Sequence, residues 1–144
     1  MRVRRLNHSV YQINYHLVWG TKYRRKILKS YVRSELIKSL YRTQRRHPDW
    51  YFRSINTGDD HVHLLIEIPP KDAVANVVRE LKATSSAHLK KRFPFIQKIY
   101  RKRGRLWSAG YFVSTVGLNE NQIRRYIEQQ NVWDRGVTLS DELS

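Results

Sequence analysis

The feature that most constrains the fold is a segment in the middle of the chain, HVHLLIEI, in which apolar residues occupy every second position. On an extended strand, residues i and i+2 point to the same face of the sheet. Val62, Leu64 and Ile66 therefore form an apolar row that belongs to a core. His61 and His63 point together to the opposite face, where two imidazoles can hold one divalent cation. Taken alone, such a pair is more often two ordinary strand histidines than a metal site.

Composition limits the chain to one compact domain with an affinity for polyanions. The 144 residues are 40% hydrophobic, which is enough for one core and leaves no room for a second domain of normal size. We therefore expect a single domain over residues 1–144, with its core at about 10–132 and a short polar tail at 133–144. Lysine and arginine number 28 against 12 acidic residues, a formal net charge of +16. This balance favours nucleic acid as the partner.

The positive charge is concentrated in residues 1–34 and 81–119, which contain no acidic residue. Aromatic rings are interleaved with the basic runs, a pattern typical of phosphate contacts beside base stacking. Any single run is also typical of a solvated surface. The candidate DNA-contacting residues, assigned by region, are Arg4, Arg5, Lys22, Arg24, Arg25, Lys90, Lys91, Arg92, Arg101, Lys102, Arg103, Arg105, Arg124 and Arg125.

No segment of the sequence indicates a membrane or a secretory route. Every apolar stretch is shorter than the roughly 20 residues that span a bilayer, and no hydrophobic region follows the charged N-terminus. We therefore expect a cytoplasmic protein with no membrane partner. The sequence contains no cysteine, so nitrogen and oxygen atoms must bind any metal.

Hydrophobic periodicity predicts the element order strand, helix, strand, strand, helix, strand, followed by one more helix. The expected strands lie at residues 10–19, 50–56, 61–68 and 106–116, the expected helices at about 27–46, 72–89 and 120–132, and a basic connecting loop at 97–105. This order is that of the split βαβ, ferredoxin-like α+β fold, an antiparallel sheet with two helices on one face. The histidines would then lie on the open face, which only the last helix is left to cover.

The expected last helix carries two residues that can complete a site over the histidines. Helical spacing places Tyr126 and Gln130 one turn apart on the same face. If this face covers the sheet, Gln130 offers an amide oxygen as third metal ligand and Tyr126 a phenol oxygen beside the metal. A tyrosine at such a position is more commonly a core residue. His16 on the first strand fits either a partner of this site or a structural histidine, and we leave it out of the catalytic set.

Four sequence motifs occur between residues 11 and 130. They are YHLVW with TKYRR at residues 15–25, HVHLL at 61–65, LWSAGYFVSTVG at 106–117 and RYIEQQ at 125–130. In this order they resemble the motifs of the single-tyrosine HUH transposases of the IS200/IS605 insertion-sequence group (TnpA type). The resemblance covers nearly the whole chain.

The resemblance implies a DNA transposase that cleaves and rejoins single-stranded DNA at insertion-sequence ends. In that group the two HUH histidines bind a divalent metal, which implies His61 and His63. A helical tyrosine is the nucleophile and a glutamine one turn later completes the metal site, which implies Tyr126 and Gln130. Tyrosine attack leaves a 5′-phosphotyrosine and a free 3′-hydroxyl. The group also implies a homodimer that recognises DNA hairpins near the element ends, with the tyrosine helix acting in its own subunit or in the partner.

Two imidazoles and an amide oxygen suit Mg²⁺ as the metal in the cell, with Mn²⁺ as a substitute, and we expect no nucleotide cofactor.

Three alternatives share much of this chemistry: a REP-associated tyrosine transposase acting on chromosomal palindromes, a rolling-circle replication initiator and a hydrolytic metal nuclease. The alternative outside enzymology is a non-catalytic ferredoxin-like nucleic-acid-binding module.

Overall fold

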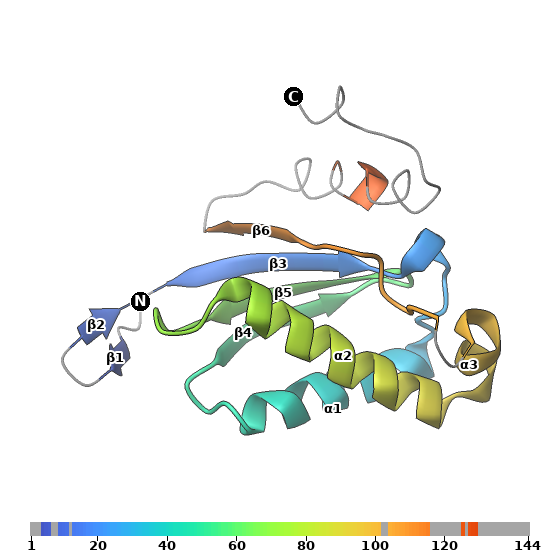
Figure 1. Ribbon diagram of the computed structural model, residues 1–144, viewed down its shortest axis with the longest axis horizontal. Coiled ribbons are helices and arrows are strands. Elements are labelled where there is room, and N and C mark those ends of the chain that lie inside the picture. Colours follow the sequence, from blue (N-terminus) through green and yellow to red (C-terminus); the bar gives the residue numbers. More distant parts are fainter. Residues whose placement is uncertain are drawn as a thin grey trace.

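The computed structural model describes residues 4–6, 9–11, 13–101, 104–115, 125 and 127–129. The elements in chain order are β1 (Arg4–Leu6), β2 (Ser9–Tyr11), β3 (Asn14–Gly20), the short 3-10 helix η1 (Lys22–Arg24), α1 (Ser30–Arg45), β4 (Tyr51–Thr57), β5 (His61–Glu67), α2 (Val74–Arg92), α3 (Pro94–Tyr100) and β6 (Phe112–Thr115). Figure 1 shows the sheet as one layer and the long helices as a second layer beneath it.

Strands β3, β4, β5 and β6 form one antiparallel sheet, in the spatial order β4-β5-β3-β6. β3 and β5 are therefore the central strands, and their register pairs His16 with Leu65 and Val18 with His63. The connection from β3 through α1 to β4 passes over the place that β5 occupies, which is the split βαβ arrangement. The α+β ferredoxin-like fold expected from the sequence is confirmed.

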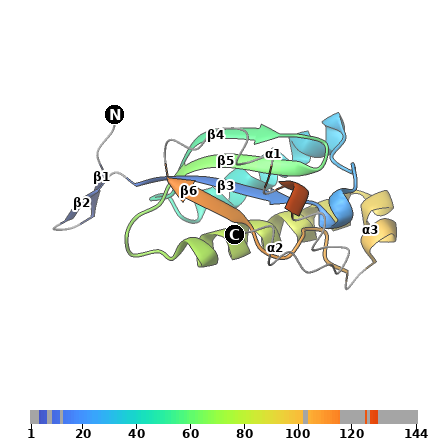
Figure 2. The same ribbon diagram turned by 90° about the horizontal axis from the view of Figure 1, so that it is seen from above.

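Helices α1 and α2 cover one face of this sheet, and the view from above in Figure 2 shows the strands side by side over them. Val62, Leu64 and Ile66 of β5 are fully buried in the same core as Leu36 of α1 and Leu81 of α2. The apolar row of the sequence is thus confirmed as the core face of the strand. The alternate side chains of β5 belong to the other face.

Residues 97–105 are not a continuous basic loop, because α3 (Pro94–Tyr100) includes the first four of them. Pro94 stands in the first turn, where its missing N–H costs no helical hydrogen bond. Ile96 and Tyr100 are buried in the core, which anchors this short helix. The expectation of a loop is therefore wrong for residues 97–100.

Two strands are shorter than their hydrophobic patterns. The strand expected at residues 10–19 is divided between β2, which pairs with β1, and β3. The strand expected at 106–116 begins only at Phe112, while Leu106 and Trp107 are buried in the core. Trp107 meets the sheet through one isolated bridge to Thr21. The apolar character of residues 106–107 therefore reflects burial in the core and not membership of a regular strand.

The helix expected at about 120–132 falls mostly outside the described residues. Within it, Arg125 and residues 127–129 are helical. The candidate site residues outside the described part of the chain are Lys102, Arg103, Arg124, Tyr126 and Gln130. Among the helices that are described, none is both long and apolar enough to cross a membrane.

Candidate active site

β5 presents His61 and His63 on the face of the sheet opposite α1 and α2. Both residues are partly buried, whereas Val62 and Leu64 are fully buried on the helix side. The arrangement follows from strand geometry, because successive side chains point to opposite faces. The two imidazoles therefore project from the same face of a central strand, as the sequence predicts.

A buried carboxylate holds the ring of His61. The Nδ1–H of His61 donates to Oδ1 of Asp60 at 2.9 Å, and Nε of Arg24 donates to Oδ2 of Asp60 at 3.1 Å. Burial by itself raises the pKa of Asp60, but the His61 hydrogen bond and the Arg24 charge outweigh burial and hold this pKa below its ordinary value. Asp60 is therefore ionised at neutral pH. Because the Asp60 carboxylate accepts from Nδ1–H, the neutral form of His61 has its lone pair on Nε2, where a ligand can bind.

His63 is hydrogen-bonded to a third histidine. Its Nε2 lies 3.0 Å from Nδ1 of His16 on β3, and the two ring centroids are 5.2 Å apart. Burial is the main cause that lowers the pKa of His63, and the neighbouring His16 and His61 lower it further. His63 is therefore neutral at physiological pH, which is the form in which imidazole binds a metal.

Sequence reasoning left His16 out of the catalytic set and did not identify Asp60. In the register of β3 and β5, His16 lies opposite Leu65, so His63 is its diagonal neighbour on the same face. This contact could be found only from the strand register. Asp60 had a simpler signal, because a carboxylate directly before His61 is a natural partner for its ring nitrogen.

The described residues supply two of the three metal ligands that the sequence resemblance implies. Both imidazoles fit the role: Asp60 holds Nδ1 of His61 and leaves Nε2 open, and a neutral His63 that donates from Nε2 to His16 leaves its own Nδ1 open. Within the described ranges, no group of three or more His, Cys, Asp or Glu side chains could hold a metal ion. The expected third ligand, Gln130, and the expected nucleophile, Tyr126, lie outside these ranges, so their places over the sheet stay predictions.

Helix η1 brings basic residues next to the histidine pair. The backbone N–H of Thr21 donates to the backbone oxygen of Asp60 at 2.9 Å, which places the start of η1 beside His61. Arg24 then reaches the carboxylate of Asp60. The basic candidates gathered at this end of the sheet are Lys22, Arg24 and Arg25.

The other basic candidates belong to separate elements of the fold. Lys91 and Arg92 are exposed at the end of α2, and Arg101 is exposed directly after α3. Nζ of Lys90 donates to the carbonyl oxygen of Gly104, and its partial burial lowers the pKa of Lys90. The remaining described candidates are Arg4 and Arg5 in β1, Arg105 before β6, and Arg125.

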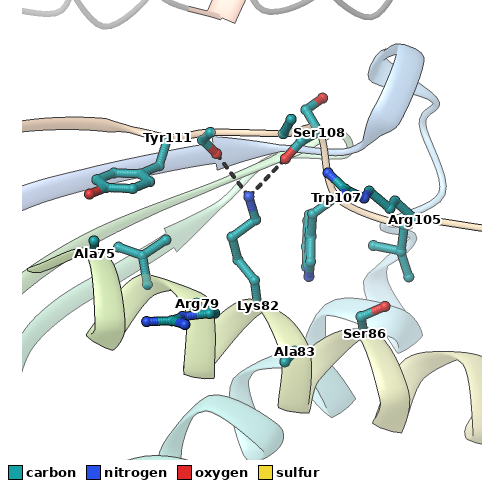
Figure 3. Close-up of a pocket in the computed structure, with 13 residues that line it drawn as sticks. Ala75, Arg79, Lys82, Ala83, Ser86, Arg105, Trp107, Ser108 and Tyr111 are labelled. Atoms are coloured by element: carbon teal, nitrogen blue, oxygen red, sulfur yellow. Dashed lines mark hydrogen bonds between the residues drawn. The ribbon is translucent and has the colours of Figure 1, made fainter.

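A pocket of about 440 Å³ lies between α2 and residues 105–111 (Figure 3). Nζ of Lys82 donates to the carbonyl oxygens of Ser108 at 2.7 Å and Gly110 at 2.8 Å, drawn as dashed lines in Figure 3. Lys82 thereby ties the segment that precedes β6 to α2. The pocket lies against the helix layer, so it is separate from the histidine pair on the opposite face of the sheet.

The topology, the histidine pair and the charge together define a class of protein. It is a basic ferredoxin-like domain that presents two imidazoles on the open face of a central strand, held by Asp60 and His16. The two histidines are those to which the resemblance to HUH transposases assigns a metal, whereas the contacts with Asp60 and His16 come from the structure alone.

Comparison with known families and proteins agrees with this class. The sequence model of the family described as Transposase IS200 like matches residues 9–130. The transposase for insertion sequence element IS200 from Salmonella typhimurium strain LT2 is 34% identical over 142 residues, which cover 96% of this chain and 88% of that protein. The ISDra2 transposase TnpA of Deinococcus radiodurans is 34% identical over 124 residues, which cover 85% of this chain and 86% of that protein.

Solved structures share the fold. A crystal structure of a transposase candidate from Deinococcus radiodurans R1 superposes with a TM-score of 0.78 at 29% identity, covering 88% of this chain and 97% of that chain. A REP-associated tyrosine transposase bound to a REP hairpin superposes with a TM-score of 0.55 at 14% identity, covering 92% of this chain and 71% of that chain. The second likeness shows a common fold alone.

The chain belongs to the IS200-like transposase family. It is accordingly a DNA-processing enzyme with a transposase role.

Proposed function

We propose that this transposase cleaves and rejoins single-stranded DNA at insertion-sequence ends, with Tyr126 as nucleophile and His61, His63 and Gln130 as ligands of one divalent cation. The observation that carries the proposal is the pair of partly buried imidazoles on the open face of β5, each held by a partner of its own. Two ordinary strand histidines do not need a buried carboxylate to select one tautomer. Ligands of a metal gain from it, because an outer partner fixes the ring for coordination.

The proposed reaction exchanges one phosphoester for another. The phenolic oxygen of Tyr126 attacks the phosphorus of the scissile phosphodiester and gives up its proton. The bond between phosphorus and the 3′ oxygen breaks, and the leaving oxygen takes a proton to become a free 3′-hydroxyl. The DNA 5′ end stays attached as a phosphotyrosine. Attack of another 3′-hydroxyl on that phosphotyrosine rejoins a strand, and no nucleotide cofactor is required because the phosphoester is conserved.

A bound Mg²⁺, or Mn²⁺ as a substitute, would polarise an oxygen of the target phosphate and stabilise its developing charge. The protein's own contribution is to fix the two imidazoles through Asp60 and His16 and to surround the anionic strand with cations. Lys22 and Arg24 of η1 lie at the histidine end of the sheet, where a phosphate backbone can be neutralised. We further propose a hairpin near the cleavage site and a homodimer as the working assembly.

The test of this proposal is formation of a covalent adduct. A single-stranded oligonucleotide that carries a hairpin next to a candidate element end is incubated with the protein and Mg²⁺ or Mn²⁺. We expect a protein-DNA adduct that survives denaturation and is lost in Tyr126→Phe. Tyr41→Phe, a change at an exposed tyrosine of α1, serves as the matched control and should leave the adduct unchanged.

Two results would contradict the proposal. Cleavage without any adduct would indicate water as the nucleophile, as in a hydrolytic metal nuclease. Binding without cleavage across several element-end substrates would favour a non-catalytic module. The DNA that flanks the gene separates the two transposase types, since an insertion sequence places subterminal palindromes on both sides of it.

A further inference from the structure

Three aromatic rings, from α1, from α3 and from the junction between α2 and α3, meet at one end of the molecule. The ring of Tyr31 on α1 lies 5.7 Å from Phe93 and 6.4 Å from Phe95, and the Phe93 and Phe95 rings are 6.2 Å apart. The guanidinium of Arg92 lies 5.5 Å from the Phe93 ring. We call the three rings the Tyr31 platform.

Only part of the Tyr31 platform serves the core. Phe93 is 8% exposed and belongs to the hydrophobic core, whereas Tyr31 is 57% exposed. A ring that is this exposed buries little apolar surface, so it contributes little to the stability of the fold. The Tyr31 ring therefore has a solvent-facing surface and is braced from behind by Phe93 and Phe95.

The surroundings of the Tyr31 platform are strongly basic. Lys29 precedes α1, and Lys91 and Arg92 end α2; all three side chains are exposed. Glu35 is the nearby carboxylate; it is hydrogen-bonded to His88 and Lys38, and its Oε1 also lies 3.8 Å from Nε of Arg92. Cations therefore outnumber this one carboxylate, and an exposed ring beside an excess of positive charge suits a polyanion that also carries flat bases.

A second tyrosine of α1 shows what is distinctive about Tyr31. Tyr41 is 42% exposed and its ring lies 5.3 Å from Phe52, which is 8% exposed like Phe93. Tyr41 lies roughly 15 Å further along the helix axis. Exposed arginines follow Tyr41 at positions 42, 45 and 46, and the carboxylates at that end of the helix layer are paired, Asp49 with Lys71 and Glu80 with His47. Tyr31 differs from Tyr41 in having a second ring, that of Phe95, packed against it.

The Tyr31 platform also lies at the end of the sheet where the histidines begin. The backbone N–H of Leu28, just before α1, donates to the carbonyl oxygen of Asp59 at 2.9 Å. On the other side, the hydroxyl of Tyr100 at the end of α3 donates to the carbonyl oxygen of Lys22 in η1 at 3.0 Å. In Figure 1 the start of α1, α3 and η1 occupy the same end of the molecule. A strand leaving the histidine pair past η1 therefore meets the Tyr31 platform next.

We propose that the Tyr31 platform is a second contact surface for single-stranded DNA, on which an unpaired base stacks against Tyr31 while Lys29, Lys91 and Arg92 contact its phosphates. This inference rests on the single-strand specificity proposed above and adds a surface outside the histidine site. The strand continues from the open face of the sheet around the end of the molecule to the helix layer. Short strands that occupy the histidine site alone do not reach Tyr31.

The test is single-strand affinity as a function of length. Fluorescence anisotropy with labelled oligothymidylates of increasing length measures the dissociation constant of the full-length wild-type protein, Tyr31→Ala, Tyr31→Phe and Tyr41→Ala. Above a threshold length, Tyr31→Ala should bind about tenfold more weakly, in line with the value of one base-aromatic stack. Tyr31→Phe keeps the ring and should bind as wild type, and Tyr41→Ala should also bind as wild type.

Each other outcome has a definite meaning. Equal affinity of Tyr31→Ala and wild type at every length overturns the platform and leaves the proposed function standing. An equal loss in Tyr31→Ala and Tyr41→Ala, or a loss in Tyr31→Phe, also overturns it, because neither reflects stacking at this site. Failure of the wild-type protein to bind single strands overturns the proposed function and the platform together. If Tyr31→Ala does not fold, Tyr31→Leu keeps apolar packing on Phe93 without a stacking ring and should show the same tenfold loss.

Discussion

The two faces of β5 differ in what holds their side chains in place. On the helix side, Val62, Leu64 and Ile66 are fully buried among apolar residues of α1 and α2. On the opposite side, His61 and His63 are partly buried and are held by hydrogen bonds to Asp60 and His16. Hydrophobic burial tolerates many shapes, whereas hydrogen bonds fix individual atoms. The helix-side residues of β5 thus stabilise the fold, and the residues on its other face are held in position for the site.

Paired polar groups extend along the open face beyond the histidines. The guanidinium of Arg53 on β4 donates to Oε1 of Glu67 on β5 at 2.8 Å and to Oδ1 of Asn14 on β3 at 2.8 Å. Glu67 is completely buried, so this pairing is what allows a carboxylate there. Polar residues from three neighbouring strands are therefore interlocked, which makes this face rigid without an apolar core.

The largest effect on stability should come from the helix side. Leu64→Ala removes a fully buried side chain and should lower the free energy of unfolding by about 2–5 kcal/mol. Urea unfolding followed by circular dichroism measures this change. The matched control is Leu65→Ala, one residue further on the open face, where the side chain is only partly buried and the loss should be smaller. Equal losses at the two leucines would contradict the division of the strand into a stabilising face and a chemical face.

The second-largest effect should be a loss of metal affinity at the open face. Asp60→Asn removes the negative charge that selects the Nδ1–H form of His61 and should weaken Mn²⁺ binding about 10- to 100-fold. Electron paramagnetic resonance of free Mn²⁺ gives the affinity without an activity assay.

The neighbouring carboxylate provides the control for Asp60→Asn. Asp59→Asn makes the same change of charge one residue earlier and should leave Mn²⁺ affinity nearly unchanged. Equal affinities of Asp60→Asn and wild type would show that the Asp60 contact does not position a metal ligand. Absence of Mn²⁺ binding by the wild-type protein would instead count against the metal site itself.

The smallest effect concerns a charged contact within the helix layer. Hydrogen bonds from His88 on α2 and from Lys38, in that order, lower the pKa of Glu35 on α1. A carboxyl with a lowered pKa adds stability above its ordinary pKa and loses it as pH falls through the folded-state pKa. The melting temperature of Glu35→Gln should therefore be slightly lower than that of wild type at neutral pH, and the two should converge in acid. A difference that stays constant from about pH 7 to about pH 3 would show that ionisation of Glu35 is not its cause.

Local sequence patterns predicted most of the fold. The period of two in Val62, Leu64 and Ile66 identified the core face of β5, and helical periods identified α1 and α2. Patterns were less informative where apolar residues are buried without regular pairing. Leu106 and Trp107 look like part of a strand but fill the core before β6. Residues 97–100 look like the start of the basic stretch that continues to Arg105, although Lys98 is the one basic residue of α3.

The chain alone determined which chemistry was available: two histidines on one strand face, a basic composition without cysteine, and a sequence order that resembles the HUH transposases. Tertiary structure decided which groups hold those histidines. His16 and His63 are 47 residues apart in the sequence, and Arg24 and Asp60 are 36 apart, so their contacts depend on the register of β3 against β5 and on the path of η1. Periodicity reports which face a residue occupies, because that depends only on its neighbours in the chain. A hydrogen bond between distant residues depends on distances of a few ångströms that only the packed sheet sets.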